Sequence, residues 1–303
     1  MTSDMAGKVV VVTGATSGIG RVTAQSLAER GATVAIVGRS PEKTAATVAA
    51  IQQASGNQAV AGFLADLSAQ RQVRALAAQL QARYPLIDVL VNNAGGLFAE
   101  RQVTEDGLEM TFAVNHLAYF LLTNLLLDNV LAAGAAHGEA RIVNVASRAG
   151  ERASGLAFDD LQGERRYNMM GAYGASKLAN LLFNSELARR LALAGAPVTT
   201  NAMHPGLVHT SFGSNNRLWY LRLGYVFINL LGRTPAQGAD TAVYLATAPE
   251  LAGVTGQYFY ERKALALSAV AGDPQAARRL WQVSEQLTGW TAGAPTMATA
   301  ATH

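Results

Sequence analysis

Residues 8–20, KVVVVTGATSGIG, join an apolar run to a glycine-rich turn and decide the expected fold. Four successive valines are typical of a strand that is buried on both faces of a parallel sheet. The glycines let the backbone turn tightly and approach a phosphate, and a helix expected over about 20–30 would offer N–H groups and the positive end of its dipole to that anion. The spacing is G-x-x-x-G-x-G. A plain turn is the alternative, but a place between a buried strand and a helix favours pyrophosphate binding.

Strands and helices alternate along the rest of the chain. Apolar runs predict further strands at residues 32–37, 58–64, 87–91, 140–146, 197–203 and 257–260. Helices are expected between them, one beginning at Pro41 and a long one over about 104–130. The alternation predicts an α/β, single-domain Rossmann fold over residues 1–288, with a doubly wound parallel sheet of about seven strands and helices on both faces. Residues 289–303 are rich in Ala, Thr and Gly without periodicity, and we expect a disordered tail there.

The composition excludes several functional classes. The chain has 303 residues, 50% of them hydrophobic, and a net charge of +3 without a Lys/Arg-rich block, which argues against nucleic acid as a partner. It has no cysteine and no His/Asp/Glu cluster with metal-ligand spacing, so we expect neither disulfides nor a metal. No apolar run reaches the roughly 18 residues of a membrane span. Residues 1–4 lead almost directly into the first strand, without a secretory signal, so we expect a cytoplasmic protein.

Two charged residues follow the second and third strands. Arg39 stands where an acid would accept hydrogen bonds from the ribose of NAD, and its guanidinium instead suits the 2′-phosphate of NADP. The sequence therefore favours NADP(H) over NAD(H), which stays possible, and a solvated arginine is the alternative. Asp66 could accept a hydrogen bond from the adenine amino group or cap the next helix.

Polar residues also lie where later strands end. The fourth strand runs into Asn93, Ala94 and Gly95, at the edge where parallel sheets bind ligands, although a simple asparagine turn is the alternative. Asn115 lies inside an apolar helix, so its amide needs partners, either as a structural bridge or in a polar relay. Ser147 follows the fifth strand and could contact a ligand or cap a helix.

Tyr173 and Lys177 are four residues apart in a run that is expected to be helical, so they share one face, one turn apart. A free tyrosine has a pKa of about 10, and a nearby ammonium lowers that pKa because it favours the phenolate. The pair could therefore transfer a proton. A tyrosine that covers the core beside a solvated lysine is the alternative interpretation.

Together these motifs resemble the classical short-chain dehydrogenase/reductase family in their order and approximate spacing. The matching residues are TGATSGIG (13–20), NNAG (92–95), Asn115, Ser147, YGASK (173–177) and HPG (204–206). The resemblance covers about residues 8–260. It looks most like the retinol dehydrogenase branch, through residues 114–126, 161–191 and 234–281. It implies an NADP-dependent oxidoreductase that transfers a hydride between nicotinamide and an alcohol or carbonyl substrate, assembled as a homodimer or homotetramer.

The resemblance also implies a role for each matching residue. Tyr173 would be the general acid in carbonyl reduction and the base in alcohol oxidation, and Lys177 would lower its pKa and bind the nicotinamide ribose. Ser147 would hydrogen-bond the substrate oxygen, and Asn115 would hold a water on the proton path from Lys177. His204 would be structural. The expected cofactor contacts are Gly14, Thr16, Ser17, Gly18, Ile19, Gly20, Arg39, Asp66, Leu67, Asn93, Ala94, Gly95, Tyr173, Lys177, Pro205, Gly206 and Val208.

Two stretches are expected to form the substrate pocket, residues 150–170 and 209–232. The second is apolar with few charges, which favours a lid that closes over a hydrophobic alcohol or carbonyl and excludes water. A core or dimer-interface helix and an interfacial membrane helix are the alternatives. For the whole chain, the alternative function is a catalytically silent NADP(H)-sensing protein. The intact set of Asn115, Ser147, Tyr173 and Lys177 argues against it, because binding alone needs no phenol beside a lysine.

Overall fold

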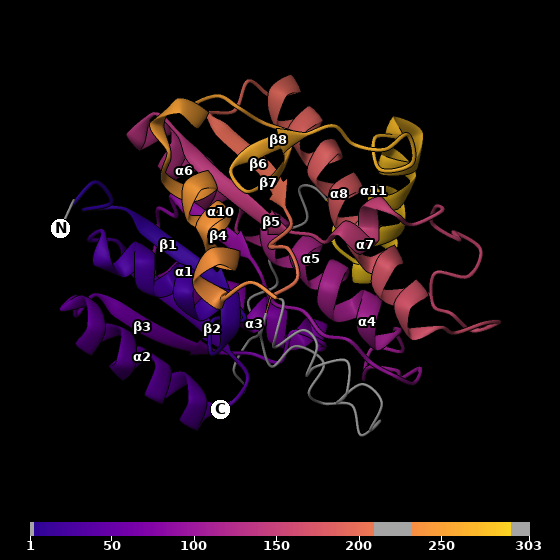
Figure 1. Cartoon of the computed structure of the whole chain (residues 1–303), viewed down its shortest axis with the longest axis horizontal. Helices are drawn as coiled ribbons and strands as arrows, with labels where there is room; N and C mark the ends of the chain where they lie inside the picture. Colours follow the sequence, from indigo (N-terminus) through magenta and orange to yellow (C-terminus); the bar gives the residue numbers. More distant parts are fainter. Residues whose placement is uncertain (1–2, 209–231, 292–303) are drawn as a thin grey trace, which may run out of the picture.

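The computed structural model describes residues 3–208 and 232–291 (Figure 1). The predicted lid at 209–232, apart from its last residue, and the predicted tail from residue 292 onward lie outside the described residues.

A twisted, mainly parallel sheet forms the centre of the described fold (Figure 1). Its strand order is β3-β2-β1-β4-β5-β6-β7-β8. The strands are β1 (Val9–Thr13), β2 (Thr33–Gly38), β3 (Val60–Leu64), β4 (Val89–Asn92), β5 (Ala140–Val145), β6 (Val198–Met203), β7 (Tyr258–Tyr260) and β8 (Lys263–Leu265). All neighbours pair in parallel except β7 and β8, which form an antiparallel hairpin. The predicted parallel, doubly wound sheet is confirmed, and the exposed edge strand β8 is an addition that the sequence analysis missed.

Helices cover both faces of the sheet, as predicted. Side chains of α1 (Gly18–Glu29), α2 (Pro41–Ser55) and α10 (Pro235–Thr247) belong to one core cluster. Side chains of α3 (Gln70–Arg83), α5 (Ala118–Leu125), α6 (Leu127–His137), α8 (Met169–Leu193) and α11 (Pro274–Thr288) belong to another. Four shorter helical elements complete the described set, namely α4 (Met110–Phe112), the π-helical segment Ala113–Leu117, α7 (Arg148–Glu151) and the 3-10 turn Pro249–Leu251.

The long helix predicted over 104–130 is wrong in its extent. Residues before Met110 form a turn that closes at Gly107, whose φ of 77° suits glycine, and Glu109 caps the helix that follows. A π-helical segment, Ala113–Leu117, then leads into α5, and the chain bends by 56° before α6. Among the described residues, only this bent pair of helices has the length and apolar character of a membrane span, and no single helix does.

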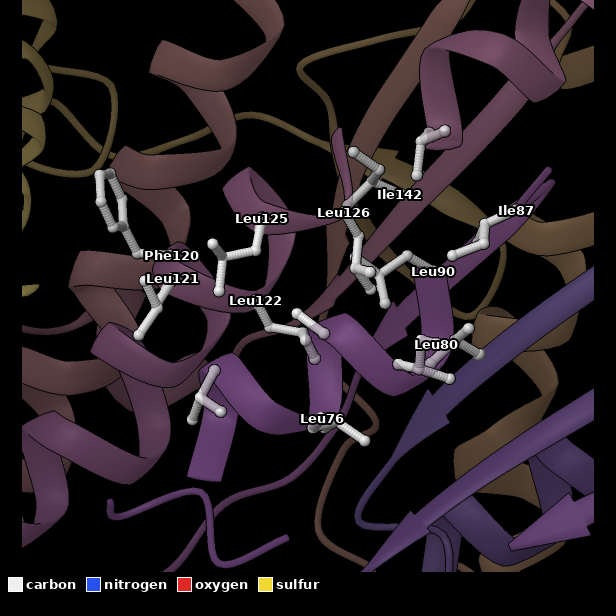
Figure 2. Close-up of a cluster of buried hydrophobic side chains, with 14 of the residues drawn as sticks. Leu76, Leu80, Ile87, Leu90, Phe120, Leu121, Leu122, Leu125, Leu126 and Ile142 are labelled. Atoms are coloured by element: carbon white, nitrogen blue, oxygen red, sulfur yellow. The ribbon is translucent and has the colours of Figure 1, made fainter. Parts of the chain in front are cut away.

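The core under α3 and α5 consists almost entirely of aliphatic side chains (Figure 2). Figure 2 shows Leu76 and Leu80 of α3 facing Leu122 and Leu125 of α5, with Leu90 of β4 beside them. Leu76, Leu80 and Leu90 have no exposed surface. Because burying a leucine stabilises the fold by roughly 1.5–3 kcal/mol, this cluster holds the helices firmly against the sheet. The carboxyl ends of β1, β4, β5 and β6 are thereby fixed at one edge.

Candidate active site

The glycine-rich turn after β1 packs directly against the end of β4. Gly14 has a φ of 63°, and a Cβ on it would lie 2.7 Å from Ala94 Cα. A Cβ on Gly20 would overlap the Asn93 amide and lie 2.5 Å from the Gly14 oxygen. Asn93 Nδ2 donates to the oxygens of Thr13 (2.8 Å) and Gly14 (3.2 Å). Asn93 and Ala94, predicted as cofactor contacts, therefore hold the shape of the turn, and glycine is required where the backbones meet.

The amino end of α1 lies directly beyond this turn. Ser17 is the N-cap residue, and its side chain makes no capping hydrogen bond to the helix. The first N–H groups of α1 therefore suit an anionic ligand, as expected for Gly18, Ile19 and Gly20. Ile19 and Val208 both pack against Gly238 of α10, where a Cβ would lie 3.2 Å from Ile19 Cγ1 and 2.7 Å from Val208 Cγ2.

Arg39 follows β2 and is 70% exposed. Its nearest charged partner is Asp66, at 3.8 Å from Nη1 to Oδ2, and an exposed pair at this distance contributes roughly 0–1 kcal/mol. The guanidinium could therefore turn toward another anion at little cost. Asp66 accepts hydrogen bonds from the N–H and hydroxyl of Ser68. The alternative of Asp66 as a helix cap is wrong, because Ala69 occupies the N-cap position of α3. Leu67 is partly buried against the core.

Ser147, Tyr173 and Lys177 come together at the carboxyl end of β5. Ser147 follows β5, caps α7 by accepting from Ala149 N (3.2 Å) and hydrogen-bonds Tyr173. Lys177 is one turn further along α8, and its Nζ donates to the Val145 oxygen (2.9 Å) and lies 6.0 Å from the Tyr173 ring centroid. Ser147 is thus a helix cap whose hydroxyl also faces Tyr173. The alternative interpretation of Lys177 as a solvated lysine is wrong, because this residue is only 3% exposed.

Burial changes the proton affinities of this pair. Removal from water raises the pKa of Tyr173, and the hydrogen bond with Ser147 acts in the opposite direction. Burial also lowers the pKa of Lys177 to about 7. The sequence argument expected Lys177 to lower the Tyr173 pKa, and this expectation is not met. The reason is that the phenolate loses hydration, and a lysine with a pKa of about 7 carries only part of its charge at neutral pH.

Asn115 forms a buried bridge from the π-helical segment. Its Oδ1 accepts from Gly96 N (2.7 Å), and its Nδ2 donates to the Gly96 oxygen and to Ser176 Oγ, both at 3.0 Å. Its own carbonyl accepts from Asn180 Nδ2 (2.9 Å). Of the two readings left open by the sequence, these contacts favour the structural bridge, which ties the loop after β4 to α8.

A ladder of buried side chains underlies the same edge and was missed by the sequence analysis. Asn92 of β4 donates to Asn144 of β5 (3.0 Å), and Asn144 donates to Thr200 of β6 (3.1 Å) and Asn184 of α8 (3.2 Å). Because buried polar groups lose their water partners, these bonds join α8 to β5 and β6, and β5 in turn to β4. The signal was an asparagine or threonine inside each of these apolar strands.

The turn after β6 lies beside Ser147, because β5 and β6 pair with Val145 opposite Met203. Gly206 has a φ of 80°, and its N–H donates to Nδ1 of His204 (3.2 Å). The His204 ring stacks on the Tyr260 ring at a centroid distance of 4.2 Å. Burial and the charges of nearby arginines lower the His204 pKa to about 4, so the ring is neutral near pH 7.

His116, which is next to Asn115 in the chain, is packed inside the helical layer. Its ring nitrogens lie 3.3 Å from Asn180 Oδ1 and 2.9 Å from Ser284 Oγ. Burial lowers its pKa to about 4. His116 is therefore a packed residue of the helical layer. Across the described ranges, no group of His, Cys, Asp or Glu side chains could hold a metal ion.

The stretch at 150–170 packs against the loop that follows β4. Tyr167 donates its hydroxyl hydrogen to the Phe98 oxygen (2.8 Å), and Arg101 Nε donates to the Gln162 oxygen (2.8 Å). On the other side, the Arg279 guanidinium of α11 lies 4.3 Å from the Phe158 ring centroid. Residues 150–170 therefore pack beside the loop that contains Gly95 and Gly96.

Comparison with known proteins agrees with this arrangement. A family model for short chain dehydrogenases matches residues 8–158. Human retinol dehydrogenase 13 is 42% identical over 289 residues, which cover 93% of this chain and 85% of that protein. The crystal structure of an uncharacterised Mycobacterium paratuberculosis protein has a TM-score of 0.75 and 33% identity, with 95% and 97% of the two chains covered.

A ketoreductase is also similar. The crystal structure of a single-residue variant of actinorhodin polyketide ketoreductase with NADPH has a TM-score of 0.66 and 29% identity, over 86% of this chain and 97% of that one. The resemblance drawn from the sequence is therefore confirmed. The chain belongs to the short-chain dehydrogenase/reductase family, is similar to the retinol dehydrogenases, and is an oxidoreductase of the kind that acts on CH–OH or C=O groups.

Proposed function

We propose that this protein is an NADP-dependent oxidoreductase that transfers a hydride between nicotinamide and an apolar alcohol or carbonyl substrate, with Tyr173 as general acid and base. The observation that carries the proposal is the meeting of Ser147, Tyr173 and the buried Lys177 at the sheet edge that also holds the glycine turn. A buried lysine is costly to keep, and a structural role alone would not require one there.

When bound, a nicotinamide dinucleotide would supply or accept the hydride at the carbon that bears the substrate oxygen. In reduction, negative charge develops on that oxygen, and Ser147 and Tyr173 stabilise it by donating hydrogen bonds. Tyr173 then gives up its hydroxyl proton to form the new O–H bond. Lys177 is adjacent and half protonated near pH 7, so it can return a proton to the phenolate. In oxidation the same protons move in the opposite direction. Positioned general acids contribute roughly 10²–10⁴-fold.

Two features of the chain suit a dinucleotide with a 2′-phosphate. The glycine turn lies at the amino end of α1, whose first N–H groups and dipole favour a pyrophosphate, and glycine at 14 and 20 lets the turn pack against Asn93 and Ala94. Arg39, beyond β2, is largely exposed and could pair with a phosphate on the adenine ribose. The similar ketoreductase crystal structure is one with NADPH, which supports the same choice. NAD(H) remains the second possibility.

A catalytically silent NADP(H)-sensing protein of the same fold is the alternative. Both functions predict cofactor binding, and only the first predicts turnover. The test is a screen that follows nicotinamide absorbance while aldehydes, ketones and secondary alcohols are offered with NADP(H) and with NAD(H). We expect NADPH consumption with apolar carbonyls. Binding of NADPH with no turnover across the panel would favour the silent protein, and no binding of either nucleotide would refute both.

Assembly and location stay predictions of the sequence analysis. The implied homodimer or homotetramer is checked by light scattering coupled to size-exclusion chromatography, and the cytoplasmic location by fractionation of the source cells.

A further inference from the structure

Four side chains gather around the turn that follows β6, and they are called the turn clamp here: His204, Tyr260, Arg233 and Glu261. They come from the end of β6, the end of β7, the residue before the α10 cap and the tip of the β7–β8 hairpin. None was predicted as a binding residue. His204, Tyr260 and Arg233 surround Gly206, which with Pro205 is one of the expected cofactor contacts, and Glu261 pairs with Arg233.

His204 and Tyr260 form the inner half of the turn clamp. The two rings lie nearly parallel, at 7°, with centroids 4.2 Å apart. His204 Nδ1 accepts the Gly206 N–H, which requires a lone pair on that nitrogen, as the neutral ring provides. A Cβ on Gly206 would lie 3.4 Å from the Tyr260 ring and 2.8 Å from Arg233 Cδ. The backbone of the turn is thus enclosed on several sides and held in its left-handed conformation.

Arg233 and Glu261 form the outer half. Arg233 donates from its side chain to the Tyr260 hydroxyl (3.1 Å), to the Gln237 carbonyl (3.3 Å) and to Glu261 in an ion pair. Its backbone N–H donates to the Leu207 oxygen (2.7 Å), which joins it to the turn itself. The Arg233 side chain is 23% exposed, so its bonds to Tyr260 and Glu261 are partly protected from water.

The hairpin tip holds Glu261 in place at a conformational cost. Glu261 and Arg262 have φ values of 49° and 61°, the only non-glycine residues with positive φ among those described. Such a backbone costs roughly 1–3 kcal/mol per residue unless its surroundings compensate. Both residues form ion pairs outside the hairpin, Glu261 with Arg233 and Arg262 with Asp240 of α10. Only the pair of Glu261 with Arg233 belongs to the turn clamp.

We propose that Tyr260, Arg233 and Glu261 are positioning residues, which act through His204 and Gly206 to hold the Pro205–Gly206 turn in the shape that receives the nicotinamide half of the cofactor. This inference rests on the proposed function. Its specific content is that the β7–β8 hairpin, whose second strand was not predicted from the sequence, governs one half of the dinucleotide site. The adenosine half depends instead on the glycine turn and Arg39, on the other side of β4.

The test compares two probes by calorimetry: NADPH, and adenosine 2′,5′-bisphosphate, which lacks the nicotinamide half. Tyr260→Leu removes the stacking on His204, and Arg233→Met keeps the packing of the stem but removes the bonds to Tyr260 and Glu261. We expect NADPH to bind about 10-fold more weakly to Tyr260→Leu and about 5-fold more weakly to Arg233→Met, consistent with the loss of one or two hydrogen bonds or ring contacts. Adenosine 2′,5′-bisphosphate should bind within about twofold of wild type, because its site lies apart from the clamp.

Arg262→Gln is the matched control, since it removes the other ion pair of the same strained tip, and it should leave both affinities unchanged. Tyr260→Phe keeps the ring and should recover most of the NADPH affinity. Unchanged NADPH affinity in both test variants, an equal loss for both probes, or an equal effect of Arg262→Gln would overturn the inference. A wild-type protein that binds adenosine 2′,5′-bisphosphate no less tightly than NADPH would also overturn it. If wild type bound neither probe, the proposed function would fail, and this inference with it.

Discussion

Replacing Lys177 by methionine tests the buried lysine most sharply. The side chain is 3% exposed, its Nζ donates to the Val145 oxygen, and burial lowers its pKa from 10.5 to about 7. Methionine keeps a stem of similar length but cannot carry a proton. The variant should therefore be more stable than wild type at low pH, although it loses turnover.

The size and sign of the effect follow from proton linkage. Between pH 7 and pH 10.5 the unfolded chain holds the proton on Lys177 and the folded chain largely does not, so the stability of wild type rises with pH in this window. At about 1.4 kcal/mol for each tenfold change in proton affinity, the burial costs about 5 kcal/mol at pH 6 and about 2 kcal/mol at pH 9. Loss of the bond to Val145 costs about 1 kcal/mol at both. The free energy of unfolding of Lys177→Met should thus exceed that of wild type by about 4 kcal/mol at pH 6 and by about 1 kcal/mol at pH 9.

Urea unfolding of both proteins at pH 6, 7, 8 and 9, without cofactor, measures this difference. Lys43→Met is the control, because the Lys43 side chain is exposed and its hydration does not change on folding. The account of a desolvated lysine would be refuted if the stability gained by Lys177→Met were the same from pH 6 to pH 9. It would also be refuted if the variant were less stable than wild type at every pH.

Three further changes probe other parts of the structure. Gly20→Ala should abolish NADPH binding measured by fluorescence titration, because the new Cβ would collide with Asn93 and the Gly14 oxygen; wild-type affinity would show that the turn can adapt. Arg39→Asp should weaken NADPH about 10-fold or more relative to NADH, since a charge-assisted phosphate contact is lost; an unchanged ratio of the two Kd values would remove Arg39 from cofactor choice. Tyr258→Phe should raise the free energy of unfolding in urea by about 1 kcal/mol, because the buried Tyr258 hydroxyl has no hydrogen-bond partner among the described residues; a clear loss of stability would reveal a partner.

The parallel sheet and the gathering of the site were predictable from sequence. Valine-rich runs define buried strands, and strands joined by helices must point the same way, so the residues after β1, β4, β5 and β6 had to meet at one edge. The meeting of Ser147 with Tyr173 on α8 was expected instead from the family resemblance. The strand argument places only Ser147 at this edge. It rests on periodicity and connection length, which the sequence displays directly.

Other features depend on three-dimensional surroundings that periodicity does not report. The residues of β8 are all exposed and carry no alternation, so only pairing with β7 defines them. The π-helical segment around Asn115 comes with bonds of its side chain to Gly96 and Ser176, which lie 19 and 61 residues away. The direction in which the Tyr173 pKa shifts depends on how much water the fold removes from its hydroxyl. Arg233 approaches Gly206 only because the chain returns to the turn after β6 just before α10.

The central claim is that Tyr173 exchanges the proton with the substrate oxygen, and Tyr173→Phe tests it most directly. The ring stays, the hydroxyl that bonds Ser147 is lost, and NADPH should bind within about twofold of wild type, because the ring and all the other expected cofactor contacts are kept. With a carbonyl substrate found in the screen, NADPH oxidation by this variant should fall by at least 10²-fold. Tyr173→Phe that binds NADPH and still turns over at the wild-type rate would contradict the account.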